Sequence, residues 1–277
     1  MPYVLVTGAT SGIGWVTTRL LAKQGWTVFA CGLPDNNFPS LNLPNGHVIA
    51  VDITDDASVR AMMSQVRQVT NQLHGLVNCA GINLLGALET LPIERLSKQL
   101  EVNTFGTLCV IQACLPLLRV GKGRIVNVSS IMGEVAMPLL GAYSISKHAL
   151  EAMSDVLRLE LHPSGIKVSV IQMGAVQTPM TSQMRQLVDA AAAKLSEQQR
   201  IHYHWLYDGM RQALQRQAQS AISSEQVADV IFHTLTAKNP KERYRVGAAS
   251  KGLSWMRRLA PEAIGDWILL KALGLKP

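Results

Sequence analysis

Short apolar runs alternate with longer amphipathic stretches along most of this 277-residue chain. The apolar runs are contiguous and rich in β-branched residues, which is typical of strands buried on both faces of a parallel sheet. They occupy residues 3–7, 27–31, 47–52, 75–81, 123–130 and 167–174. Helical patterns of ten or more residues separate most of them. This alternation predicts βαβ units with right-handed crossovers, and hence an α/β fold with one Rossmann-like, doubly wound parallel sheet.

The pattern changes after Gly174. Residues 180–222 contain no strand-like run and are polar, helical in pattern and rich in Gln and Ala. We expect them to form a helical lid insertion over the carboxyl edge of the sheet, where ligands bind in such folds. Residues 227–235 resume a core-type helix, 243–247 suggest a last strand, and 240–277 form a C-terminal extension. No repeat or linker divides the chain, so residues 1–277 are predicted to be a single domain.

The amino-acid composition limits which classes of partner are expected. Hydrophobic residues make up 48% of the chain and charged residues 16%, which favours one large core over disorder. The net charge of +7 is compatible with nucleic acid or an anionic membrane surface. Aromatic residues are scarce and form no stacking platform with arginines, so no nucleic-acid partner is expected. The basic and apolar tail leaves peripheral membrane contact as an alternative that the sequence does not favour.

The cysteines and histidines do not predict a metal site. Cys31, Cys79, Cys109 and Cys114 show no metal-binding spacing, and the pair of histidines in HYHW (202–205) lacks a third ligand. The cysteines are therefore interpreted as reduced thiols. With no cleavable leader or apolar stretch of about 18 residues, a cytoplasmic location is expected.

A glycine-rich turn, TGATSGIG (7–14), follows the first strand and opens the first helix. Gly8 permits a tight turn, Gly12 allows the backbone to approach a pyrophosphate, and Gly14 lets helix and strand pack closely. The helix N-terminus would offer free N–H groups to the phosphates. The alternative is an ordinary βα turn without a ligand, but the flanking strand and helix favour the dinucleotide.

This turn resembles the TGxxxGIG cofactor motif of the short-chain dehydrogenase/reductase family, and other marks of that family follow over residues 3–180. VDIT (51–54) resembles the family's adenine-contacting segment, and NCAG (78–81) resembles its NxAG motif. EVNTFG (101–106) resembles the segment that carries the relay asparagine. YSISK (143–147) matches the YxxxK motif. The resemblance implies the catalytic residues Asn103, Ser130, Tyr143 and Lys147. It implies that the cofactor is bound by Gly8, Thr10, Ser11, Gly12, Ile13, Gly14, Asp52, Ile53, Asn78, Ala80, Gly81, Tyr143, Lys147, Gly174, Val176 and Thr178. The chain departs from the family's Pro-Gly after the sixth strand, because Met173 precedes Gly174.

The chemistry of these residue types is consistent with proton transfer. Tyr143 and Lys147 are at i and i+4 and so share one helical face. A tyrosine with a pKa of about 10 is a poor acid–base group at neutral pH, and a nearby ammonium together with an oxidised nicotinamide should lower that pKa. Ser130 ends a strand thirteen residues earlier, where its hydroxyl can hold the substrate oxygen. Each residue also has a purely structural interpretation: a strand-end turn for Ser130, a surface amide for Asn103 and a solvated amine for Lys147.

The nicotinamide cofactor is less well specified. Gly32 and Leu33 occupy the positions after the second strand where relatives carry an aspartate or an arginine, and Ser11 occupies a position that is often basic in NADP-dependent members. Asp35 lies three residues later and could still reach the ribose. The absence of a phosphate partner favours NAD over NADP.

The substrate is predicted only by class. The lid supplies methionines and other apolar residues, and the tail loosely resembles that of steroid and retinol dehydrogenases. These features predict an NAD(P)-dependent oxidoreductase that interconverts a bulky apolar alcohol with its ketone or aldehyde. The alternative is a non-catalytic dinucleotide-sensing regulator on the same fold. The predicted helices at 92–119 and 144–161 carry more apolar residues than one core-facing side would bury. This excess predicts that they pack between subunits of a homodimer or homotetramer.

Overall fold

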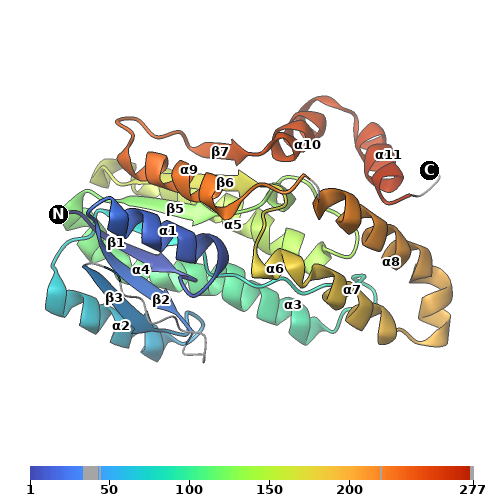
Figure 1. Cartoon of the computed structure of the whole chain (residues 1–277), viewed down its shortest axis with the longest axis horizontal. Coiled ribbons are helices and arrows are strands. Elements are labelled where there is room, and N and C mark those ends of the chain that lie inside the picture. Colours follow the sequence, from blue (N-terminus) through green and yellow to red (C-terminus); the bar gives the residue numbers. More distant parts are fainter. Residues whose placement is uncertain (34–42, 44, 219, 275–277) are drawn as a thin grey trace.

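The computed structural model has a seven-stranded, fully parallel sheet at its centre, with helices on both faces (Figure 1). The structure describes residues 1–33, 43, 45–218 and 220–274, so Asp35 lies outside the described residues. The strands are β1 (Tyr3–Thr7), β2 (Thr27–Gly32), β3 (Gly46–Ala50), β4 (Gly75–Asn78), β5 (Arg124–Val128), β6 (Lys167–Met173) and β7 (Arg243–Val246). Their order is β3-β2-β1-β4-β5-β6-β7, so the direction of winding reverses between β1 and β4. A crevice at the carboxyl ends of these two strands is where such sheets bind ligands.

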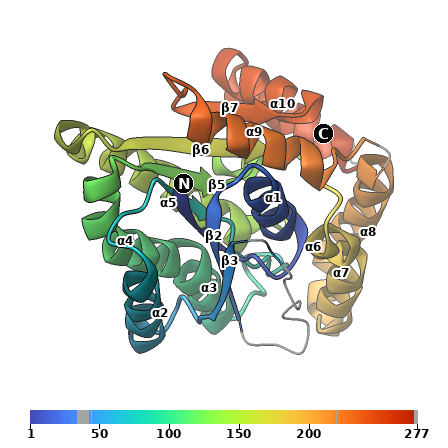
Figure 2. The same cartoon turned by 60° about the vertical axis from the view of Figure 1, so that its left-hand side comes forward.

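Two apolar layers hold the helices to the sheet, because successive side chains of a strand point to opposite faces. Leu5 of β1 packs with α2 (Asp56–Val69) and α4 (Thr107–Gly121). Val4 and Val6 pack on the other face with α1 (Gly12–Lys23) and α9 (Ser224–Thr236). Figure 2 shows these two groups of helices on opposite sides of the sheet. The predicted strand and helix alternation is confirmed.

The remaining helices and helical turns follow, and except for η3, which precedes β6, most of them carry or cover the carboxyl edge. They are α3 (Ile93–Leu100), the π-helical turn η1 (Glu101–Gly106), the 3-10 turns η2 (Ile131–Gly133) and η3 (His162–Ser164), α5 (Gly141–Glu160), α6 (Pro179–Ser182), α7 (Met184–Ala193), α8 (Glu197–Ala218), α10 (Ala248–Leu259) and α11 (Glu262–Ala272). Helix α5 begins two residues before Tyr143, so the tyrosine lies in its first turn rather than ahead of it.

Helices α6 to α8 form a separate lobe beyond the carboxyl ends of the strands (Figure 1). Helices α7 and α8 pack through a third apolar cluster that includes Met184, Val188 and Tyr207, together with Leu139 and Leu140 before α5. The described part of residues 180–222 thus lies beyond that edge, and its role as a substrate lid stays a prediction.

The segment Ile93–Gly121, which joins α3, η1 and α4, is long and apolar enough to cross a membrane by length and composition alone. Its α4 part buries Val110, Ile111 and Leu118 in the main core, and its η1 part buries Asn103. We therefore assign it to the core of the fold.

Candidate active site

The glycine turn between β1 and α1 forms the floor of a groove of about 390 Å³. Gly8 and Gly12 have φ angles of 64° and 53°, which favour glycine. A Cβ on Gly8 would lie 2.7 Å from the backbone nitrogen of Ala80, and one on Gly14 would collide with the carbonyl oxygen of Gly8. The turn thus packs closely against the residues that follow β4 and against the first turn of α1.

Most of the residues expected to bind the cofactor line this groove. They are Gly8, Thr10, Ser11, Gly12, Ile13, Gly14, Asp52, Ile53, Ala80, Gly81 and Thr178. Ser11, the N-cap of α1, makes no side-chain capping hydrogen bond, so the first N–H groups of that helix remain available. A backbone cradle that a Cβ would fill, next to an uncapped helix N-terminus, fits the pyrophosphate of a dinucleotide.

Asp52 lines the groove and is held in place by hydrogen bonds from Thr54. Its Oδ1 accepts hydrogen bonds from the hydroxyl of Thr54 at 2.7 Å and from the backbone nitrogen of Thr54 at 2.9 Å. These two bonds, first that from the side chain, lower the pKa of Asp52. The carboxylate is therefore ionised at neutral pH and is held in one orientation.

A smaller pocket of about 120 Å³ adjoins the groove at the carboxyl end of β5. It gathers residues from three segments of the chain that the sequence predicted to meet: Ser130, Tyr143, Lys147, Gly174, Val176 and Thr178. Ser130 follows β5, Tyr143 and Lys147 lie on α5, and the other three follow β6. The side chains expected at the reacting end of the cofactor thus share one pocket.

Ser130 is fixed by its neighbours. Its Oγ accepts a hydrogen bond from the backbone nitrogen of Met132 at 3.2 Å and donates one to the carbonyl oxygen of Met173 at 3.4 Å. Met173, which stands where the family has proline, therefore supplies a backbone partner for the serine.

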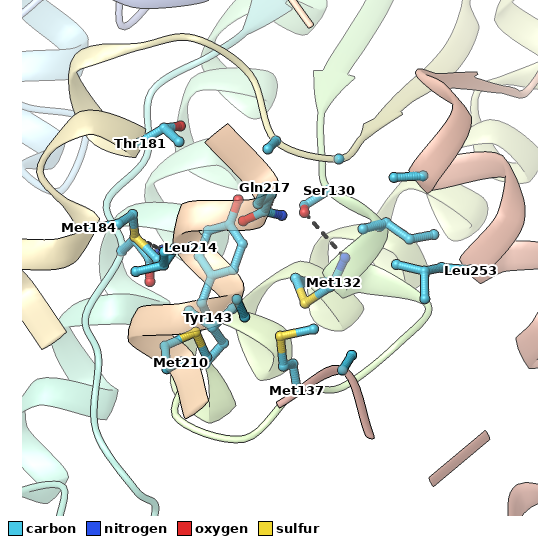
Figure 3. Close-up of a pocket in the computed structure, with 18 of the residues that line it drawn as sticks. Ser130, Met132, Met137, Tyr143, Thr181, Met184, Met210, Leu214, Gln217 and Leu253 are labelled. Carbon is cyan, nitrogen blue, oxygen red and sulfur yellow. Dashed lines mark hydrogen bonds between the residues drawn. The ribbon is translucent and has the colours of Figure 1, made fainter. Parts of the chain in front are cut away.

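Tyr143 points its hydroxyl into the cavity beside Ser130 (Figure 3). Burial raises the pKa of Tyr143 to about 12, and the neighbouring Ser130 hydroxyl lowers it by less. The expected lowering of the tyrosine pKa is therefore not present in the ligand-free protein. Desolvation of the phenolate outweighs the hydrogen bond to Ser130.

Lys147 is 6% exposed and lies beneath the tyrosine. Its Nζ donates a hydrogen bond to the carbonyl oxygen of Val128 at 2.9 Å and lies 5.6 Å from the centroid of the Tyr143 ring. Burial lowers the pKa of Lys147 to about 8, while Cys79 and Glu151 act in the opposite direction. The lysine is thus a buried group and not a solvated surface amine.

Asn103 ties the loop after β4 to helix α5. Its Oδ1 accepts from the backbone nitrogen of Ile82 at 2.9 Å, and its Nδ2 donates to the carbonyl oxygen of Ile82 at 3.0 Å and to Oγ of Ser146 at 3.1 Å. Asn103 is 1% exposed and belongs to the π-helical turn η1, a form of helix that is frequent at functional sites. The surface-amide interpretation is therefore wrong.

Asn78 is placed differently from the other predicted residues. Its Nδ2 donates to Oδ1 of Asn127 at 2.8 Å, and Nδ2 of Asn127 donates to Oγ of Ser154 at 2.9 Å. This buried chain links β4, β5 and α5 behind the pocket, and Asn78 does not line the groove. Its part in cofactor binding stays a prediction.

A cavity of about 360 Å³ opens above Ser130 and Tyr143. Methionines surround the tyrosine on several sides, and Gln217 of α8 extends its amide toward the two hydroxyls (Figure 3). The methionines that line the cavity are Met132, Met137, Met180, Met184 and Met210. The walls come from η2, the lid, α10 and α11, so the C-terminal extension completes the cavity.

Sequence reasoning missed several groups at this site. Gln99, one helical turn before Asn103, donates to the carbonyl oxygen of Ile82 at 2.7 Å and accepts from the backbone nitrogen of Leu84 at 2.8 Å. The i, i+4 spacing of the two amides is a signal that could have identified it. Gln217 carries no such signal, because only the tertiary arrangement of the lid brings it to the cavity.

Comparison with known proteins agrees with this geometry. The family model described as short chain dehydrogenase matches residues 2–189. The chain is 34% identical over 276 residues to a 3-amino-tetrahydro-pyrrolizinone reductase of Xenorhabdus hominickii, covering 97% of this chain and 95% of that protein. It is also 34% identical over 286 residues to human retinol dehydrogenase 16, covering 96% and 88% of the two chains.

Solved structures share the fold. A short chain dehydrogenase from Burkholderia cenocepacia in complex with NADP superposes with a TM-score of 0.76 at 24% identity, covering 97% of each chain. An actinorhodin polyketide ketoreductase variant with NADPH has a TM-score of 0.75 at 25% identity, covering 90% of this chain and 97% of that one. The chain is a short-chain oxidoreductase and belongs to the short-chain dehydrogenase/reductase family, whose members bind NAD(P).

Proposed function

We propose that this oxidoreductase interconverts a bulky apolar alcohol of steroid or retinoid size with the corresponding carbonyl compound, a secondary alcohol with its ketone or a primary alcohol with its aldehyde. The observation that carries the proposal is the convergence of Ser130, Tyr143 and Lys147 on one pocket that continues into a methionine-lined cavity. A cavity of about 360 Å³ lies within the range of small-molecule sites. Methionine side chains are polarisable and adapt to irregular apolar ligands.

In the proposed mechanism the protein residues position the substrate oxygen and move its proton. When bound, the nicotinamide cofactor supplies or accepts the hydride. Ser130 holds the substrate oxygen, and Tyr143 transfers a proton to it or removes one from it. Lys147 would hold the nicotinamide ribose of a bound cofactor and favour the phenolate of Tyr143 by its charge. Asn103 holds the Ile82 backbone and α5 in register and supports the proton relay.

For the cofactor we propose NAD in preference to NADP. The groove ends after β2 with Gly32 and Leu33, which offer no charge to a 2′-phosphate. Among the described residues that line it, Lys98 is the one cation, and its Nζ lies 3.4 Å from the carboxylate of Glu101. The ratio of kcat/KM for NAD and NADP tests this preference, and a hundredfold advantage for NADP would refute it.

We further propose a cytoplasmic homodimer or homotetramer. Phe105 of η1 and Val156 and Leu159 of α5 are 61%, 52% and 65% exposed, although they are large and apolar. Covering these residues with a second copy would remove apolar surface from water. All four cysteines are free, which is consistent with a reducing compartment. Sedimentation velocity of the purified protein would reveal the oligomer.

The substrate proposal is tested with one panel of steroid, retinoid and short aliphatic alcohols and ketones, each assayed with both cofactors by nicotinamide absorbance. We expect kcat/KM to be at least about tenfold higher for the bulky apolar members, because each additional buried methylene contributes about 0.8 kcal/mol. Met210→Asp, which places a charge in the cavity wall, should reduce that advantage. Faster turnover of short polar alcohols would contradict the proposed substrate class.

A further inference from the structure

Helix α10 packs against the protein with a face that combines buried serines with Ala249 and Leu253. Ser250 and Ser254 are 0% and 2% exposed, and Oγ of Ser250 donates to the carbonyl oxygen of Gln172 at 3.2 Å. The opposite face carries Lys251, Trp255 and Leu259, which are four residues apart and therefore form one stripe. Trp255 is 66% and Leu259 is 72% exposed. Two large apolar side chains of this helix, Trp255 and Leu259, thus face outward.

Helix α11 also exposes large apolar side chains on its outer face. Leu269 packs on the apolar cluster of the lid, while Ile264 and Trp267 are 50% and 44% exposed. Ile264, Trp267 and Lys271 are at i, i+3 and i+7 and so share the outer face. Nζ of Lys271 lies 4.7 Å from the centroid of the Trp267 ring. Each helix therefore presents one tryptophan, one aliphatic residue and one lysine to the surroundings.

This combination is typical of helices that lie in a membrane interface. Tryptophan is enriched at the level of the lipid headgroups, and lysine interacts with anionic lipids while its stem lies along the apolar layer. Lys251 has no carboxylate partner within the part of the chain that the structure describes, whereas Arg257 pairs with Glu262 and Arg258 with Glu134. The free charge on α10 is thus available to a negative surface.

A second copy of the chain fits this surface less well. A two-fold interface places the same patch of each subunit opposite itself. The patch that holds Lys251 and Lys271 would then meet an equally basic patch, and like charges oppose association. An anionic bilayer complements both the apolar and the basic residues.

We propose that the outer faces of α10 and α11, defined by Lys251, Trp255, Leu259, Ile264, Trp267 and Lys271, bind the surface of an anionic lipid bilayer. The inner faces of the same helices contribute Ala249, Leu253 and Ala272 to the cavity above Tyr143. The membrane-binding surface and the cavity therefore lie on opposite faces of the same two helices. This location revises the sequence analysis, which did not favour membrane contact.

The test is co-sedimentation of the full-length protein with vesicles of phosphatidylcholine alone or mixed with phosphatidylglycerol, without cofactor or substrate. We expect binding to the mixed vesicles, and we expect that binding to weaken with added salt, because salt screens the attraction between the lysines and the anionic lipids. The double variant Trp255→Ser/Trp267→Ser should bind at least about tenfold more weakly, since the apolar contacts are lost. Lys251→Glu should lower the affinity by about fivefold or more.

Matched substitutions elsewhere control for surface changes in general. Ile201→Ser on α8 removes an apolar side chain that is 67% exposed, and Lys23→Glu reverses a charge at the end of α1. Both should bind vesicles as the unmodified protein does, and all variants should keep its thermal unfolding midpoint. Equal binding to both vesicle types, or unchanged binding of the double variant, overturns the proposal. A smaller oligomer for the double variant in vesicle-free sedimentation velocity also overturns it, because it identifies a second copy as the occupant.

Discussion

The ammonium of Lys147 is held 5.6 Å from the centre of the Tyr143 ring by a hydrogen bond to the carbonyl oxygen of Val128. The bond joins α5 to the end of β5, so the lysine is positioned by the sheet as well as by its own helix. Its charge acts on the tyrosine from a fixed position in a desolvated pocket, where electrostatic interactions are stronger than in water.

Tyr143→Phe should lower kcat by about 10²- to 10⁴-fold, because it removes the proposed proton donor and acceptor. The dissociation constant of NAD should stay within about twofold, since the ring and its packing remain. Stopped-flow turnover and cofactor titration measure the two quantities. Tyr203→Phe, which removes a hydroxyl on α8 that donates to Glu89, is the matched control and should leave turnover nearly unchanged. An active Tyr143→Phe enzyme would remove the assignment.

The affinity of the free enzyme for the cofactor should weaken as the pH rises through about 8. Burial lowers the pKa of Lys147 to about 8, so the ammonium is present below that pH and is lost above it. The proposed contact with the nicotinamide ribose uses the charged form, and cofactor binding should in turn raise this pKa. Fluorescence titration of NAD from pH 6.5 to 9.5 gives the profile, and Lys147→Met should flatten it. A profile with the same inflection in Lys147→Met would assign the titration to another group.

The amides of Asn103 and Gln99 should contribute to stability as well as to function. Asn103→Leu leaves the backbone nitrogen of Ile82 without its partner, and an unsatisfied buried group costs about 1–3 kcal/mol. Gln99→Leu leaves the nitrogen of Leu84 in the same state and should cost a similar amount. Urea unfolding measures both losses. Asn103→Leu should also reduce kcat more than Gln99→Leu does, because Asn103 alone reaches α5 through Ser146. Equal effects on kcat would limit Asn103 to a structural role.

Glu134 should stabilise the protein above pH about 4.5 and lose this effect as the pH falls through about 2. Burial raises the pKa of its carboxyl, but hydrogen bonds from Ser254, Arg245 and Gln172, together with the charge of Arg245, lower it to about 2. The folded-state pKa is thus below the unfolded one, so the carboxylate stabilises the fold only when it is ionised.

Glu134→Gln should therefore lower the free energy of unfolding by about 1–3 kcal/mol at pH 7, with a difference that shrinks toward pH 2. Urea unfolding at a series of pH values checks this dependence, and the exposed Glu160→Gln serves as control. A loss of stability that is independent of pH would show that the carboxylate charge is not the cause.

Much of the architecture could be predicted because it depends on local patterns. The strands β1, β4 and β6 are buried on both faces, so each is a contiguous apolar run in the sequence. Tyr143 and Lys147 share a helical face by spacing alone. Their meeting with Ser130 and Gly174 follows from the rule that parallel strands end at one edge of a sheet.

The groups that escaped prediction depend on long-range contacts. Gln172 donates to Glu134 at 3.1 Å and to Glu151 at 3.0 Å, across 38 and 21 residues of chain. Arg245 reaches the same Glu134 carboxylate across 111 residues. No periodicity connects such partners. The outward face of α10 also escaped, because a helical pattern shows that two faces differ but not which one packs inward. The pKa of Tyr143 depended on the extent of burial, which residue spacing does not give.

Met180 of α6 borders the dinucleotide groove, the small pocket with Lys147 and the cavity above Tyr143. A flexible thioether side chain in this position can adjust when any one of the three spaces is filled. Because such an adjustment reshapes a wall of the other two, we expect cofactor and substrate not to bind as independent ligands. Thermodynamic linkage makes that effect mutual: the factor by which the cofactor changes the dissociation constant of the substrate is the factor by which the substrate changes that of the cofactor.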